Sequence, residues 1–416
     1  RQLTSGFNRK WSAQFTADGK HIYFLDNGQI TIYNFASGNQ SILPVRAKVL
    51  VDFHQEKLQV FSEAWRLLRD HFYDPTFRGL DWQVAYEQFL PLVAGAQTYS
   101  ELLNLLNMMV GELRASHLGA TPTWVGSYND GYTGILFDQV EQAKSGRLVV
   151  AEVLPDSPAA LATHNGGISI GDEVVAINDI PITPSTNIHM LLRESVGRRV
   201  ILEVVTPGLA PREVAVRPVS ADQYDELRYN DWVYRNEEYV YKISNGRLGY
   251  IHIRHMDYPC YQKFLSDLDA ETYRKEGVVL DVRFNGGGHT GTFILDVLAR
   301  RSVLVGNFRD RPTTAADHLA GNRVLNKPTV LVINQSSYSN TEMFAEGYRR
   351  LNLGKVVGQP TGGAVVWTFR TRLLDGTWFS LPRIRVATPE GEELEGKGRE
   401  VDVNVALPVG ENTRTG

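Results

Sequence analysis

Residues 330–346 change from a β-branched apolar run to small polar residues and then to a helical pattern. Residues 330–333 predict a buried strand, and residues 343–347 return to helical spacing. Ser339 lies at the turn between them. A serine at such a turn has its hydroxyl beside the N–H groups of a helix start, as a nucleophile with an oxyanion site requires.

The same residues also fit a helix cap. In Ser339-Asn340-Thr341-Glu342 the serine would cap the helix, and the glutamate would return a hydrogen bond to it, as in a capping box. The G-x-S-x-G motif of many hydrolases is absent here, so it does not decide between nucleophile and cap. The role of Ser339 therefore depends on other parts of the chain.

The composition is that of a globular protein with several domains. The chain has 416 residues, of which 43% are hydrophobic and 22% are charged, a length that allows about two to four domains. A net charge of −4 favours no nucleic-acid partner, and no apolar run approaches the length of a membrane span. The single cysteine, Cys260, excludes an internal disulfide framework. No H-E-x-x-H motif or ligand cluster is present, so we expect neither a metal nor a cofactor.

Residues 1–45 alternate short strand patterns with turns such as Asp18-Gly19 and Asn27-Gly28. This pattern resembles one blade of a TolB-like β-propeller. Because such blades occur in arrays, we expect the chain to be the C-terminal part of a longer product in which this blade is a propeller remnant. An intact mass that matches a start at Arg1 would contradict this expectation.

Helical spacing begins at His54, where apolar residues recur three and four positions apart. Asp81 and Thr98 each precede a further helical pattern and are the expected caps. We therefore predict a small helical domain that ends near Ser116 and His117, where the helical period stops.

Residues 131–219 alternate strand patterns with turns and resemble a PDZ domain. The predicted strands are residues 134–137, 148–153, 173–177 and 200–205. The resemblance rests on residues 131–135, on residues 155–159 and on residues 171–178. It implies that a backbone loop holds the terminal carboxylate of a peptide, which adds a strand to the sheet. This loop consists of Gly131, Tyr132, Thr133, Gly134 and Ile135. A module that only spaces its neighbours is the alternative.

From Leu248 onward strands and helices alternate, which predicts an α/β core with a mostly buried sheet. One predicted strand runs through Asp281 into a glycine run and then into a helix. The glycines let the backbone approach a bound group, and the helix start favours negative charge. Neither a P-loop lysine nor a G-x-G-x-x-G spacing is present, so an oxyanion suits this loop better than a phosphate. The run consists of Gly286, Gly287 and Gly288.

A serine nucleophile requires a base that is held in orientation. His117 follows Ser116 where the helical pattern breaks, and His289 is a rival base because it follows the glycine run. A Ser-His pair alone is a weak signal for catalysis.

The order of helical domain, PDZ domain and crotonase-like α/β core resembles the C-terminal processing and tricorn serine peptidases. The resemblance covers roughly residues 50–410. In the processing branch a lysine base lies about 25 residues after the serine, and Ala364 occupies that position here (364 − 339 = 25). A Ser-Lys dyad is therefore not expected.

The tricorn branch uses a Ser-His-Ser-Glu tetrad instead. The resemblance implies that Ser339 is the nucleophile, that His117 is the general base and later the general acid, and that Ser116 and Glu395 orient His117. From its surroundings alone, Glu395 could belong to a solvated turn. The resemblance also implies oxyanion donors among the N–H groups of Gly286, Gly287, Gly288 and Asn340.

These features predict a serine endopeptidase or oligopeptidase that forms an acyl-enzyme and acts on peptides or unfolded proteins, with the PDZ domain recruiting or gating the substrate. A non-catalytic PDZ protein on a peptidase-like scaffold is the alternative, and acyl-CoA chemistry on a crotonase-like core is a third. The tricorn resemblance also implies a homo-oligomer and a cytoplasmic location, or a periplasmic one if a signal peptide lies in a preceding part.

The expected architecture is a multidomain α/β protein with four parts. They are a propeller-like blade at residues 1–48, a helical domain at 49–125, a PDZ domain at 126–222 and a crotonase/ClpP-like α/β core at 223–416.

Overall fold

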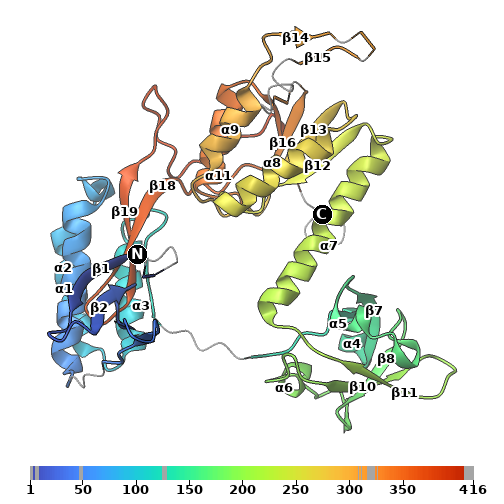
Figure 1. Ribbon diagram of the computed structural model, residues 1–416, viewed down its shortest axis with the longest axis horizontal. Coiled ribbons are helices and arrows are strands. Elements are labelled where there is room, and N and C mark those ends of the chain that lie inside the picture. The colour runs from blue at the N-terminus through green and yellow to red at the C-terminus, as the bar shows by residue number, and fades with distance from the viewer. Residues whose placement is uncertain are drawn as a thin grey trace. The chain divides into compact units, whose positions relative to one another are not determined.

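The computed structural model describes residues 3–4, 9–45, 50–123, 129–307, 309–310, 312–315, 324–325 and 327–406. The chain forms two compact units, Arg1–Lys57 and Leu58–Gly416. In the description of each unit, the elements carry the labels used in Figure 1.

The first unit holds a four-stranded antiparallel sheet in which the strands follow one another in chain order. Asn27 and Gly28 have φ angles of 48° and 83°, which suits the tight turn between the second and third strands. Phe24 and Tyr33 are buried, whereas Phe15 is 68% exposed. The four strands agree with the predicted strand pattern, and their origin in a propeller stays a prediction. The strands are β1 (Lys10–Phe15), β2 (His21–Asp26), β3 (Gln29–Asn34) and β4 (Gln40–Ile42).

Three amphipathic helices follow, the first of which begins five residues before the second unit, and their apolar stripes are buried. The Asp81 carboxylate accepts two backbone N–H groups and caps the second helix, as predicted. Thr98 caps the third helix, but the Glu101 carboxylate accepts the N–H of Gln97 and not that of Thr98. The helices are α1 (Phe53–His71), α2 (Trp82–Gly95) and α3 (Tyr99–Gly111), with a 3-10 turn, η1, at Phe77–Gly79.

A hairpin from the C-terminal part of the chain pairs with the strand that follows the helices (Figure 1). The three-stranded sheet has the order β18-β19-β5, with β5 at Gly119–Thr121, β18 at Val366–Arg372 and β19 at Trp378–Arg385. Buried Phe379 pairs with Ala120. The hairpin is also bonded to the helical segment, since the N–H of Tyr73 donates to the Pro382 oxygen at 3.2 Å and the N–H of Leu374 donates to Glu63 Oε2 at 2.9 Å.

The middle of the second unit is a sheet with the strand order β11-β10-β8-β7-β6, in which β9 also pairs with β8. Its buried residues, among them Val150, Val174 and Leu202, form one apolar cluster. Three of these strands have the predicted bounds. The elements are β6 (Ile135–Phe137), α4 (Gln139–Ser145), β7 (Leu148–Val153), α5 (Pro158–Leu161), η2 (His164–Gly166), β8 (Glu173–Ile177), β9 (Ile180–Pro181), α6 (Ile188–Leu191), β10 (Val200–Val205) and β11 (Arg212–Val216).

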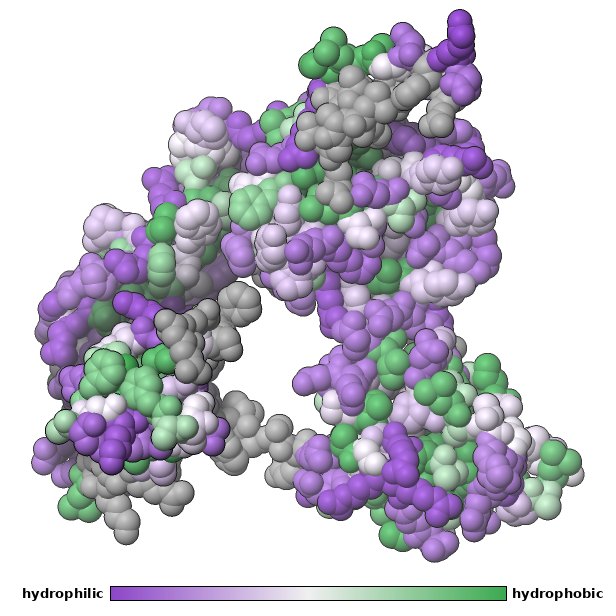
Figure 2. Space-filling view, in the orientation of Figure 1, coloured by the Kyte–Doolittle hydropathy of each residue, from purple (hydrophilic) through white to green (hydrophobic). Residues whose placement is uncertain are grey.

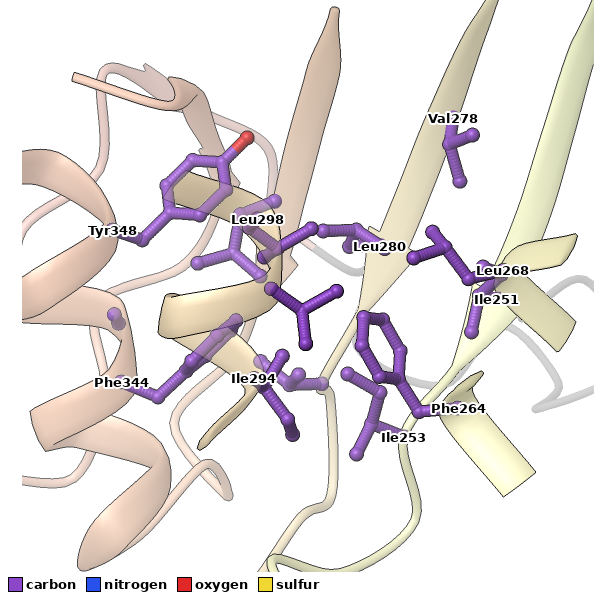
Figure 3. Close-up of a cluster of buried hydrophobic side chains, with 14 of the residues drawn as sticks. Ile251, Ile253, Phe264, Leu268, Val278, Leu280, Ile294, Leu298, Phe344 and Tyr348 are labelled. Carbon is purple, nitrogen blue, oxygen red and sulfur yellow. The ribbon is translucent and has the colours of Figure 1, made fainter. Parts of the chain in front are cut away.

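A five-stranded parallel sheet with the order β12-β13-β16-β17-β20 forms the core of the C-terminal part. Figure 3 shows Phe264, Ile294 and Phe344 from three helices meeting in the apolar cluster that packs on this sheet. The elements are α7 (Ala221–Ile243), β12 (Leu248–His252), α8 (Tyr258–Thr272), β13 (Gly277–Asp281), α9 (Gly291–Ala299), β14 (Val305–Gly306), β15 (Thr314–Ala315), β16 (Thr329–Ile333), α11 (Asn340–Arg350), β17 (Gly354–Gly358) and β20 (Val403–Asn404).

Two of the expected domain boundaries, after residues 48 and 125, lie outside the described residues. The third, after residue 222, lies in the first turn of α7, which continues unbroken toward β12. The face in Figure 2 is mostly hydrophilic, with hydrophobic residues in small groups. Within the described ranges, no helix combines the length and apolar composition of a membrane span.

Truncation of a core leucine tests this packing. Leu331 of β16 is fully buried in the apolar cluster, so Leu331→Ala should lower the free energy of unfolding by about 3 kcal/mol. Leu374→Ala is the matched control, because Leu374 is 64% exposed. Denaturant unfolding followed by circular dichroism measures both variants, and equal effects would contradict the assigned core.

Candidate active site

Two neighbouring parallel strands, β13 and β16, carry the residues of the candidate site beyond their carboxyl ends. Asp281 pairs with Val332 near the ends of these strands, and ligands of α/β sheets bind outside this edge. The two following turns are bonded to each other. The N–H of Tyr338 donates to the main-chain oxygen of Asn285 at 2.9 Å, and Thr341 Oγ1 donates to the side-chain oxygen Oδ1 of Asn285 at 2.7 Å.

Ser339 has an unusual backbone conformation at the start of α11. Its φ of 58° and ψ of −121° lie outside the extended region that capping residues usually adopt. The N–H of Ser339 donates to Glu342 Oε2 at 3.0 Å. Both contacts of the predicted capping box are present, because the N–H of Glu342 also approaches the Ser339 side chain.

The carboxylate of Glu342 is fully buried directly behind this turn. Besides Ser339, it accepts hydrogen bonds from Thr361 Oγ1 at 2.6 Å and from the N–H groups of Gly363 and Ala364 at 2.7 and 2.8 Å. Burial raises the pKa of Glu342, and these hydrogen bonds oppose the rise. The Ala364 oxygen also accepts the N–H of Ser339 at 3.0 Å. Residues 361–364 are thus fixed against the serine turn.

The glycine run approaches Ser339 more closely than any side chain would allow. Gly287 has a φ of 96°, and a Cβ on it would lie 2.7 Å from the Cβ of Ser339. The N–H of Gly287 donates to Asn285 Oδ1 at 2.9 Å and is therefore already engaged. Among the described residues, the N–H groups of Gly286, Gly288 and Asn340 donate to no protein acceptor.

Ser116, His117 and Glu395 form a continuous chain of hydrogen bonds. Ser116 Oγ lies 2.7 Å from His117 Nδ1 and 3.0 Å from Glu395 Oε2, and the N–H of Ser116 donates to Glu395 Oε1 at 2.6 Å. A carboxylate can only accept, so the Ser116 hydroxyl donates to Glu395 and accepts from His117 Nδ1–H. This tautomer leaves Nε2 of His117 as the unprotonated nitrogen.

One short segment joins the two groups of residues. The N–H of Val365 donates to Glu395 Oε2 at 2.7 Å, next to the Ala364 groups that bind Ser339 and Glu342. Thr368 Oγ1 donates to the His117 main-chain oxygen at 3.4 Å. Within the described ranges, the imidazole of His117 makes no hydrogen bond to Ser339 in this structure. The rival His289 is exposed, and its imidazole makes no hydrogen bond to a described residue.

The loop at residues 131–135 borders a pocket of about 270 Å³ in the sheet domain of the second unit. Ile188 of α6 and Tyr224 of α7 also line this pocket. The ring of Tyr224 stacks on Tyr132 with 4.8 Å between their centres. The next strand, β6, lies at the edge of its sheet. An extended peptide could add to that edge.

Comparisons with known proteins match these parts one by one. Residues 53–111 match the tricorn protease C1 domain, residues 149–206 match a PDZ domain, and residues 247–405 match peptidase family S41. Residues 247–405 belong to peptidase family S41. This makes them a domain of the serine peptidase type, and the hydrogen-bonded Ser116, His117 and Glu395 connect it to the segment that precedes the PDZ domain.

The similarity to tricorn proteases extends over nearly the whole chain. Tricorn protease homolog 1 of Streptomyces coelicolor is 31% identical over 411 residues, which cover 94% of this chain and 38% of the relative. The tricorn protease of Thermoplasma volcanium is 28% identical over 419 residues, which cover 95% and 39%. The chain thus spans less than half the length of these curated relatives.

A solved structure has the same fold. The crystal structure of the tricorn protease matches 95% of this chain and 39% of its own chain, with a TM-score of 0.77 and 24% sequence identity. The predicted mixed α/β architecture with a PDZ domain and a peptidase core of this family is therefore confirmed, whereas the propeller remnant is not.

Asn285, Ala364 and Val365 belong to the candidate site in the structure but were not predicted from the sequence. Asn285 gave a usable signal, because a polar residue between a buried strand and a glycine run marks the sheet edge where ligands bind. Ala364 and Val365 act through main-chain groups, so their side chains carried no signal. Among the described residues, no group of three His, Cys, Asp or Glu side chains is arranged to hold a metal ion.

Burial lowers the pKa of His117 below its usual value of 6.5, and the charge of Glu395 opposes this effect. We therefore expect His117 to titrate below pH 6.5 and Glu395→Gln to lower its pKa further. NMR titration of the imidazole, assigned with His117→Asn, measures both values. Glu393→Gln is the matched control, because it removes a carboxylate two residues before Glu395 that pairs with Arg385 and not with Ser116. It should leave the pKa of His117 nearly unchanged. A midpoint above 6.5 would contradict the burial of the ring.

Proposed function

We propose that the chain hydrolyses peptide bonds as a serine endopeptidase or oligopeptidase through an acyl-enzyme. Ser339 is the nucleophile, His117 is the general base and acid, and Ser116 and Glu395 orient His117. The observation that carries the proposal is the hydrogen-bonded chain from Glu395 through Ser116 to His117 Nδ1. This chain leaves Nε2 free to accept a proton, as a base for serine must.

Acylation begins when His117 Nε2 takes the proton of the Ser339 hydroxyl while Oγ bonds to the carbonyl carbon of the peptide. The negative oxygen that forms accepts hydrogen bonds from the N–H groups that the fold leaves unengaged at Gly288 and Asn340, and Gly286 lies beside them. The C–N bond then breaks, and the imidazolium gives its proton to the departing amine. Water attacks the ester with His117 again as the base, which releases the acid and restores Ser339.

The Glu395 carboxylate stabilises the imidazolium through Ser116. When Nε2 is protonated, Nδ1–H still donates to Ser116 Oγ, and the hydroxyl still donates to Glu395. No proton has to move along this chain, because each donor keeps its direction. The N–H groups of Ser116 and Val365 hold the carboxylate in place. Glu395 is therefore a positioning residue, whose negative charge acts on His117 through the Ser116 hydroxyl and does not touch the reacting atoms.

We propose that the PDZ domain recruits or gates peptide and unfolded-protein substrates. The support is the pocket beside Gly131, Tyr132, Thr133, Gly134 and Ile135, together with the open edge of β6. We further propose that the N-terminal sheet is a propeller blade, that the boundaries given above separate the domains, and that the protein assembles with copies of itself.

Substitutions at the tetrad test the catalytic proposal. Ser339→Ala or His117→Ala should reduce kcat on a cleavable peptide on the order of a millionfold, because nucleophile and base act as one unit. Glu395→Gln should cost less, because the amide oxygen can still accept a hydrogen bond. Peptide cleavage followed by mass spectrometry measures all three.

Equal residual activity in the three variants would contradict this division of roles. A folded wild-type protein that cleaves no peptide but binds peptides in the PDZ pocket would favour the second candidate function, a peptide-binding protein on a peptidase scaffold. The pocket of about 270 Å³ beside residues 131–135 is the observation that favours this second function.

Gly287→Ala tests the close approach behind the oxyanion site. The added methyl would lie 2.7 Å from Ser339 Cβ and 2.8 Å from the main-chain oxygen of Tyr338, at a φ of 96°. Because this contact would displace Ser339, we expect kcat to fall about a hundredfold or more. The matched variant is Gly286→Ala, whose methyl meets nothing within 4 Å and should cost far less. Similar losses in the two variants would contradict this geometry.

A further inference from the structure

A row of side chains runs along β18 away from His117. Successive residues of a strand point to opposite faces, so Thr368, Arg370 and Arg372 share one face of the hairpin. Thr368 Oγ1 donates to the His117 oxygen at 3.4 Å, and Arg370 Nη2 donates to Thr121 Oγ1 at 3.0 Å. At about 3.4 Å per residue, the Cα atoms of Arg370 and Arg372 lie roughly 7 and 14 Å along the strand from that of Thr368. The row therefore begins at the proposed base.

Both guanidinium groups of this row rest on the same indole. Arg372 Cζ lies 4.5 Å and Arg370 Cζ lies 5.5 Å from the centre of a Trp378 ring. Stacking on an aromatic face orients the planar guanidinium, and the N–H groups of Arg370 that do not donate to Thr121, together with those of Arg372, can bind a carboxylate. Both arginines are exposed, and neither has a carboxylate partner among the described residues. Arg385 of the same hairpin differs, because Glu393 lies 3.5 Å from it.

The backbone of β18 offers a second kind of contact. β18 is the edge strand of its sheet, and within the described part of the chain β19 is the one strand that pairs with it. An edge strand of this kind can accept an extended peptide as an added strand. Ala364 and Val365, directly before β18, bind Ser339 and Glu395. A peptide added to β18 would therefore continue toward the serine.

We propose that β18 is a docking strand for an acidic segment of the substrate, whose carboxylates bind Arg370 and Arg372. Charge complementarity decides the occupant, since two oriented guanidinium groups without acidic partners favour a pair of carboxylates. The spacing is set by the strand, because side chains two residues apart in an added peptide face the same way. The docking segment is treated as part of a substrate, so the inference rests on the proposed function and names a class of substrate for it.

Paired peptides test the docking strand. The two peptides of a pair share one cleavable sequence, and one carries two glutamates, two residues apart, where the other carries two glutamines. One pair has these residues before the cut, and a second pair has them after it. In the pair whose charged residues reach β18, the wild-type protein at low salt should cleave the glutamate peptide with a kcat/KM about tenfold higher than the glutamine peptide, mainly because KM is lower. The advantage should shrink as ionic strength rises.

The double variant Arg370→Gln/Arg372→Gln should bring the ratio of the two kcat/KM values close to one. Arg198→Gln is the matched control, because Arg198 is an exposed arginine on the PDZ domain and should keep the wild-type ratio. Equal cleavage of both peptides by the wild-type protein would overturn the docking strand and leave the proposed peptidase intact.

Binding to Ser339→Ala separates the two failures. Fluorescence anisotropy of the labelled glutamate peptide should show binding that is weakened about tenfold by Arg370→Gln/Arg372→Gln in this background. If the wild-type protein cleaves no peptide, the proposed function fails, and this binding difference alone decides the docking strand. If the double variant instead changes only the sedimentation of the free protein, the strand joins copies of the chain and the inference is wrong.

Discussion

The buried carboxylate of Glu342 is the interaction on which the geometry of the site depends. It accepts the N–H of Ser339 at the start of α11 and three donors from residues 361–364. A buried carboxylate without partners would cost several kcal/mol, so these four hydrogen bonds compensate for its burial. They also fix the turn that carries Ser339 to the segment that continues into β18.

That segment links residues that lie far apart in the chain. Val365 binds Glu395, Glu395 binds Ser116, and Ser116 binds His117. The β18-β19-β5 sheet holds the same parts together, since it pairs the strand after His117 with the C-terminal hairpin. Parallel strands meanwhile bring the glycine run beside Ser339. Two sheets thus position the candidate site, with His117 just before β5 of one sheet and Ser339 and the glycine run beyond the ends of β16 and β13 of the other.

Local patterns predicted most elements of the chain. The strands β7, β8 and β10 and the cap at Asp81 followed from periodicity and capping chemistry, which act over a few residues. The positive φ of Ser339 did not follow, because a residue other than glycine rarely adopts it and no local pattern marks one that does. The contact between Ser116 and Glu395 joins residues 279 positions apart, and only the family resemblance singled out Glu395. The pairing of β19 with β5 is equally non-local, so no local pattern predicted it.

Mapping of the residue that a fluorophosphonate labels on the folded protein is the most direct test of the central claim, that His117 activates Ser339. The reagent reacts with an activated serine, so its position reports the nucleophile without any assumption about the substrate. We predict a label on Ser339 that is lost in His117→Ala. A label on another serine, or undiminished labelling of Ser339 in His117→Ala, would contradict the account.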